Sequence, residues 1–142
     1  MERVSLDEAE YEVFLDRAMS RLPKGISEWS RFDVPHAVVF IEGNRTTLRN
    51  FKEIVERLNR DPQHLLRFLA RELATAGTIE GTRAIFQGNF SDSVFNKLIE
   101  RYVQGYVICH ECGRPDTKIK KEKRIQYLIC EACGARSPVK HV

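Results

Sequence analysis

The chain has 142 residues and a formal net charge of +3, from 23 lysine and arginine residues against 20 aspartate and glutamate residues. Its longest apolar run, AVVFI at 37–41, is too short to span a membrane, and the acidic N-terminus is unlike a signal peptide. We therefore expect a cytoplasmic protein with no membrane partner. The mild basicity gives weak support for contact with nucleic acid.

The first predicted element is an amphipathic helix that begins at a capping box of Ser5 and Glu8 and ends before Pro23. Its apolar residues recur at helical spacing and form one stripe: Tyr11, Phe14, Leu15, Ala18 and Leu22. The segment that follows, PKGISEWSRFDVP, contains prolines and a glycine and is typical of a linker. By periodicity alone, the stripe fits the protein's own core and a groove of another protein equally well.

A β-hairpin is predicted next, because residues 36–50 alternate with period two and contain Gly43 and Asn44, which favour a tight turn. A helix then begins at Asn50, which can form a second capping box with Glu53. The hairpin is therefore followed directly by a helix.

A second helix follows after a short break, with Asp61 as its N-cap and Gly77 at its end. Two further short strands are predicted to turn at Glu80 and Gly81, and a last helix begins at Ser91. The order ββααββα is most simply one antiparallel sheet whose apolar face is covered by helices, and we expect an α+β fold.

All four cysteines form one C-x2-C-x17-C-x2-C unit: Cys109, Cys112, Cys130 and Cys133. This spacing is typical of a zinc ribbon that binds one structural Zn(2+) ion, and a strand with Ile125, Tyr127 and Ile129 on one face fits its small sheet. Four thiolates leave no open coordination position, so the metal is expected to stabilise the fold and not to catalyse. We expect four parts: an N-terminal helix at 1–22, a linker at 23–35, an α+β core domain at 36–104 and the ribbon at 105–142.

A basic run in the ribbon is the best candidate for nucleic-acid contact: Lys118, Lys120, Lys121, Lys123 and Arg124. The same lysines would also suit the solvated face of an edge strand. The two adjacent helices favour an alternative function, a transcription factor that combines a zinc ribbon with a helix-turn-helix and binds DNA. Neither a P-loop nor a free catalytic triad occurs in the sequence, so we expect no enzymatic activity.

Several longer motifs carry a resemblance to the beta subunit family of archaeal translation initiation factor 2. They are LDRAMSRLP at 15–23, IEGNRTTLRNF at 41–51, LNRDPQHLLRFLARELATAGTIEG at 58–81, YVICHECGRPDT at 106–117 and CEACGA at 130–135. The resemblance covers nearly the whole chain, and the motifs of the core domain are more specific to this family than the cysteine spacing.

The resemblance implies a non-catalytic subunit of a heterotrimer that delivers initiator methionyl-tRNA to the small ribosomal subunit. In the family, the N-terminal helix docks on the GTP-binding gamma subunit, which makes the apolar stripe the expected partner-binding face. The alpha subunit, the tRNA and the ribosomal subunit are expected to be reached through the complex. The lysine-rich N-terminal extension of eukaryotic relatives is expected to be absent, and Arg3 receives no catalytic role.

Overall fold

The computed structural model describes residues 8–21 and 32–142 of the chain. It divides into two units, Met1–Arg31 and Phe32–Val142, of which the first is described through helix α1 (Glu8–Arg21) alone. Ser5, Leu22 and most of the predicted linker lie outside the described residues. In the two described stretches, no helix is both long and apolar enough to cross a membrane.

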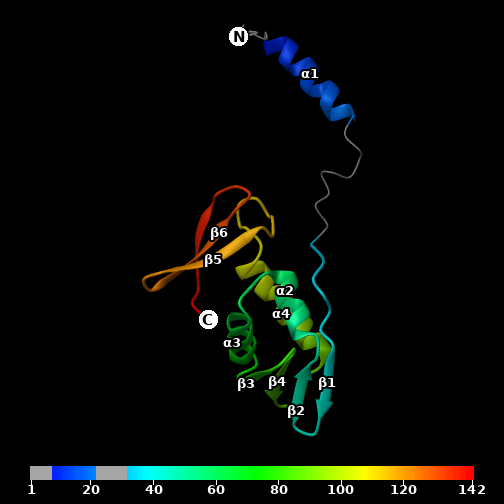
Figure 1. The fold of residues 1–142 in the computed structure, drawn as a ribbon, viewed down its shortest axis with the longest axis vertical. Helices are drawn as coiled ribbons and strands as arrows, with labels where there is room; N and C mark the ends of the chain where they lie inside the picture. Colours follow the sequence, from blue (N-terminus) through cyan, green and yellow to red (C-terminus); the bar gives the residue numbers. More distant parts are fainter. Residues whose placement is uncertain (1–7, 22–31) are drawn as a thin grey trace. The chain divides into compact units, whose positions relative to one another are not determined.

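The second unit confirms the predicted α+β fold and contains two antiparallel sheets (Figure 1). The first sheet has the strand order β1-β2-β4-β3, and the second has the order β5-β6-β7. The strands of the first sheet are β1 (Val39–Glu42), β2 (Arg45–Leu48), β3 (Gly77–Glu80) and β4 (Arg83–Gln87). Those of the second are β5 (Thr117–Glu122), β6 (Ile125–Cys130) and β7 (Arg136–Val139).

The helices of this unit are α2 (Phe51–Leu58), α3 (Pro62–Glu72) and α4 (Asp92–Tyr106). Each helix places an apolar face in a common core together with Leu48, Ala84 and Phe86 of the sheet. The helix residues buried there are Phe51, Ile54, Val55, Leu58, Leu65, Leu66, Phe68, Leu69, Phe95, Ile99, Tyr102 and Val103. Burial of each large apolar side chain contributes roughly 1.5 to 3 kcal/mol, so the core domain has the means to fold without α1.

The turn residues were predicted correctly in the first hairpin and displaced by one residue in the second. Gly43 adopts a φ of 58° between β1 and β2, where a residue with a Cβ is disfavoured. The second turn consists of Gly81 and Thr82, because Glu80 still pairs with Arg83 at the end of β3. The order of elements in this domain is otherwise the predicted one.

The predicted capping box of Asn50 and Glu53 is wrong. The Asn50 side chain accepts no hydrogen bond from the helix that follows it. Its Oδ1 instead accepts from the Val38 N–H at 2.9 Å, and its Nδ2 donates to the His36 carbonyl at 2.7 Å. Two backbone groups twelve or more residues away have therefore replaced the local cap, and Asn50 ties the entry of β1 to the start of α2.

The prediction that Gly77 ends α3 is also wrong, because the helix ends at Glu72 and Gly77 begins β3. Ala74 adopts the positive φ, 51°, after the helix. A Cβ on Gly77 would lie 2.8 Å from a ring carbon of Phe86, closer than such atoms approach in proteins. The glycine therefore permits close packing of the sheet and does not terminate the helix.

Candidate metal centre and the cleft between core and ribbon

The cysteines lie in two matched knuckles. In the first, the Gly113 N–H donates to the Cys109 carbonyl at 3.0 Å, and in the second the Gly134 N–H donates to the Cys130 carbonyl at 3.0 Å. Both glycines have positive φ angles, 69° and 75°, so the sequence places glycine where each turn requires it. The strand face predicted from Ile125 is the more exposed one, since the buried residues of β6 alternate on the other face.

The four sulfur atoms lie within 4.8 Å of one another. The Sγ atoms of Cys109 and Cys133 are 3.6 Å apart, and those of Cys112 and Cys130 are 3.5 Å apart. These distances are much longer than a disulfide bond of about 2.05 Å. They are close to the edge of about 3.8 Å expected for a tetrahedron with metal–sulfur bonds of about 2.3 Å. The cysteines could therefore hold a metal ion.

The electrostatics of the thiols also favour a bound cation. The backbone N–H groups of Cys112 and Glu111 lower the pKa of Cys109 to about 6. The Ala135 N–H acts in the same direction on Cys133, but burial and the thiols around it raise the pKa of Cys133 to about 12. Four thiolates at this separation repel one another, and a metal cation is what would keep all of them ionised.

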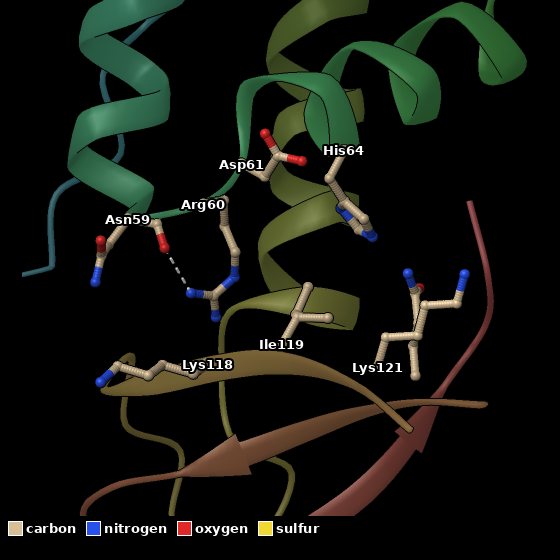
Figure 2. A pocket seen from close by; sticks show the side chains of 8 residues that line it. Asn59, Arg60, Asp61, His64, Lys118, Ile119 and Lys121 are labelled. Carbon is tan, nitrogen blue, oxygen red and sulfur yellow. Dashed lines mark hydrogen bonds between the residues drawn. The ribbon is translucent and has the colours of Figure 1, made fainter. Parts of the chain in front are cut away.

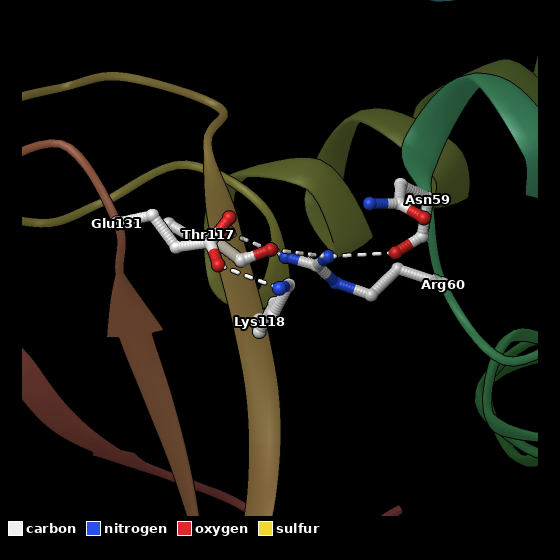
Figure 3. Close-up of polar contacts among 5 residues, drawn as sticks. All are labelled: Asn59, Arg60, Thr117, Lys118 and Glu131. Atoms are coloured by element: carbon white, nitrogen blue, oxygen red, sulfur yellow. Dashed lines mark hydrogen bonds and ion pairs between the residues drawn. The ribbon is translucent and has the colours of Figure 1, made fainter.

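Arg60 joins the α+β domain to the ribbon, a role that no sequence motif indicated. Its side chain is 9% exposed, and all five of its N–H groups donate to neutral oxygen atoms. Nε and Nη2 donate to the Tyr106 carbonyl at 3.0 and 2.9 Å, and Nη1 donates to the Asn59 carbonyl at 2.9 Å. On the ribbon side, Nη1 donates to the Thr117 carbonyl at 2.8 Å and Nη2 to its hydroxyl (Figure 3).

The charge of Arg60 is balanced by dipoles and not by a carboxylate. Its acceptor at Tyr106 is a carbonyl in the last turn of α4, where the helix dipole is negative. No ion pair of Arg60 is present among the described residues, and burial lowers the pKa of its guanidinium. The Thr117 hydroxyl donates in turn to the Val107 carbonyl, so Arg60 and Thr117 together order the connection between α4 and the ribbon.

A cleft of about 430 Å³ lies beside Arg60, between the α2–α3 connection and strands β5 and β6 (Figure 2). It is lined by Asn59, Arg60, Asp61, His64, Lys118, Ile119, Lys121 and Gln126. The structure thereby divides the predicted basic run, because Lys118 and Lys121 line the cleft and Lys120, Lys123 and Arg124 do not. Lys118 also forms an exposed ion pair with Glu131 at 2.6 Å (Figure 3).

His64 lies at the α3 side of the cleft and is half-buried. The Tyr102 hydroxyl is 2.8 Å from its Nδ1, and the rings of Tyr102 and Tyr106 pack against it. Burial lowers the pKa of His64 below its ordinary value, although Gln126 and Asp61 act in the opposite direction. The ring is therefore held in the neutral form near pH 7.

We expect acid to destabilise the fold through His64. Below about pH 6.5 the unfolded chain binds a proton on this histidine more readily than the folded chain, so stability rises with pH and falls as pH decreases. The thermal midpoint of a His64→Gln variant should fall less than that of wild type between about pH 7.5 and about pH 5.5. A His110→Gln variant, changed at an exposed residue, is the matched control. An identical decrease in wild type and His64→Gln would contradict this assignment.

The apolar stripe of α1 is exposed in all of its described members. Tyr11 is 56% exposed, Phe14 is 54% exposed and Leu15 is 46% exposed, and Ala18 is also exposed. The fifth predicted member, Leu22, lies outside the described residues. Val13 and Met19 are further exposed apolar residues of this helix, which the stripe did not include.

The α+β domain followed by a four-cysteine ribbon is a known combination. A family described as a domain found in initiation factors 2B and 5 matches residues 23–136. A translation initiation factor 2 subunit beta from Methanosphaera stadtmanae is 53% identical over 131 residues, which cover 92% of each chain. The protein of the same name from Methanococcus aeolicus is 48% identical over 134 residues, covering 94% of this chain and 96% of the relative. The one from Methanococcus maripaludis is 48% identical over 135 residues, covering 95% of this chain and 98% of the relative.

These matches define first a class, the translation initiation factors that carry this domain. Within that class, the chain belongs to the family of archaeal translation initiation factor 2 beta subunits. The predicted family is thereby confirmed. The comparisons favour translation over the alternative of a DNA-binding transcription factor, for which the structure provides no independent support.

Proposed function

We propose that this chain is the non-catalytic beta subunit of a heterotrimeric, GTP-dependent initiation factor in the cytoplasm. It binds the gamma GTPase subunit through the apolar stripe of α1. The complex also contains the alpha subunit and delivers initiator methionyl-tRNA to the small ribosomal subunit. The observation that carries the proposal is the exposed stripe on a helix outside the unit that contains the hydrophobic core.

The stripe suits a groove in a partner protein for an energetic reason. A helix of 14 residues is marginally stable alone in water, and its apolar face gains roughly 1.5 to 3 kcal/mol for each large side chain that is buried. Tyr11, Phe14 and Leu15 lie within about one turn of each other, so a single groove can receive all three. Binding would thus stabilise the helix and the complex together.

We further propose that the four cysteines bind one structural zinc ion. Thiolate ligands favour zinc among the common divalent metals of cells, and four of them complete its tetrahedral coordination. The ion would supply the folding energy that a ribbon with few buried apolar residues lacks. It would take no part in a reaction, because no coordination position remains for substrate or water.

Simultaneous Tyr11→Ala and Leu15→Ala substitution is expected to weaken binding to the purified gamma subunit by several kcal/mol, because central apolar side chains dominate such interfaces. Isothermal titration calorimetry of the full chain measures the effect. A variant with Asp16→Ala and Ser20→Ala changes two residues on the opposite face of α1, also four apart, and should bind as wild type does. If the two variants bind equally well, the stripe is not the docking face.

A further inference from the structure

The cleft between core and ribbon has an excess of positive charge. Arg60, Lys118 and Lys121 line it, against the single carboxylate of Asp61 among its lining residues. The Asp61 carboxylate is already engaged, since its Oδ1 accepts from the Gln63 N–H at 3.2 Å at the start of α3. The cleft therefore attracts an anion, and the attraction is strengthened where protein surrounds the charges and excludes water.

The lysines are available to such a ligand, whereas Arg60 is not. All five donors of Arg60 are used within the protein, so it contributes charge and geometry without a direct contact. Lys121 forms no side-chain ion pair among the described residues and extends from β5 toward the α3 side of the cleft (Figure 2). Lys118 pairs with Glu131, but both side chains are more than half exposed, and a pair of this kind is worth at most about 1 kcal/mol.

The lining also contains hydrogen-bonding capacity that the protein leaves unused. Within the described part of the chain, His64 Nε2 and Gln126 Oε1 are buried polar atoms without a hydrogen-bond partner. When Tyr102 donates to His64 Nδ1, Nε2 carries the ring hydrogen and is a donor, whereas Gln126 Oε1 is an acceptor. A ligand that presents both an anion and a hydroxyl group would match the two lysines and these two atoms.

We propose that this cleft binds the sugar–phosphate backbone of RNA. Lys118 and Lys121 contact phosphate oxygens, and Gln126 accepts a hydrogen bond from a ribose 2′-hydroxyl after rotation of its flexible side chain. The ribose hydroxyl is what distinguishes RNA from DNA at such a site. The inference deepens the proposed function, on which it rests for RNA as the partner, and it assigns the contact to a composite surface that neither domain presents alone.

The test is fluorescence anisotropy of the full, zinc-loaded chain with a labelled single-stranded RNA of mixed sequence at low salt. A variant with Lys118→Gln and Lys121→Gln is expected to bind about tenfold more weakly and to reduce the salt dependence by about one counterion or more. A matched variant with Lys120→Gln and Lys123→Gln loses the same charge from the same hairpin, outside the cleft, and should stay within about twofold of wild type. Zinc content and thermal midpoint verify that both variants are folded.

Several results would overturn the inference. Equal weakening in the two lysine variants would show that overall charge, and not the cleft, is responsible. Absence of RNA binding by wild type at low salt would exclude the site. A DNA strand of the same sequence is expected to bind more weakly, with the difference reduced by Gln126→Leu, and equal affinity for both strands would remove the role of the ribose hydroxyl. Since no measurement includes the gamma subunit, failure here is distinguishable from failure of helix docking.

Discussion

Replacing Cys130 by serine is expected to unfold the ribbon and to leave the α+β domain folded. The proposed zinc would lose one of its four ligands, and binding of a structural zinc ion by small domains is worth on the order of 10 kcal/mol. The ribbon has little to compensate, since Leu128 and the ligand cysteines provide most of its buried apolar surface. The other domain retains a core of large aliphatic and aromatic side chains.

Amide NMR spectra distinguish the two domains in one experiment. Signals of β5, β6 and β7 should collapse to the narrow range of an unfolded chain, whereas those of β1 to β4 should keep their dispersion. A chelator that removes the metal from wild type should give the same spectrum. The control is His110→Ala, which changes an exposed residue inside the first knuckle and should retain one metal ion per chain. A fully dispersed spectrum for Cys130→Ser would show that the ribbon does not depend on the metal.

Replacing Arg60 by methionine is expected to release the ribbon from the core and to destabilise the unit by about 3 kcal/mol. The substitution keeps an apolar stem but removes all five donors, and the carbonyls of Tyr106 and Thr117 lose their partners in a buried site. Arg60→Lys keeps the charge, but an ammonium group cannot reproduce a planar fork of five donors. Lysine should therefore restore only part of the stability.

Amide ¹⁵N relaxation provides a readout that a loss of stability alone would not change. In wild type, the ribbon and the core domain should tumble with one correlation time, and in Arg60→Met the ribbon should tumble faster. Arg57→Met is the matched control, because Arg57 makes one exposed hydrogen bond to Asp33 within the same region. If the two domains of Arg60→Met still tumble together, another contact holds the ribbon in place.

Local signals in the sequence were sufficient for most of the fold. Gly43 and Asn44 predicted a turn because their backbone preferences act within four residues, and Asp61 predicted a helix start for the same reason. The cysteine spacing predicted the metal-binding cluster, since each knuckle is a local structure and one ion requires both of them. These features depend on neighbours in the chain.

The errors and omissions involve residues whose partners are distant in the sequence. Asn50 holds backbone groups before β1, and Gly77 makes room for the ring of Phe86. Arg60 lies 57 residues from Thr117 and stands beside an N-cap aspartate, so its local sequence suggests only a helix boundary. The cleft could not be predicted because its lining comes from two domains whose relative placement depends on that arginine.

The joint at Arg60 limits how freely this ribbon can be exchanged between proteins. Thr117 pairs in register with Cys130, so the residue that receives the arginine is held in place by the strand that carries a metal ligand. A ribbon grafted from another protein with the same cysteine spacing would keep its own knuckles. Without a hydroxyl at the position of Thr117 and a matching chain length after α4, it would form its metal site yet remain a loose appendage. The cysteine motif is portable, but the attachment belongs to this chain.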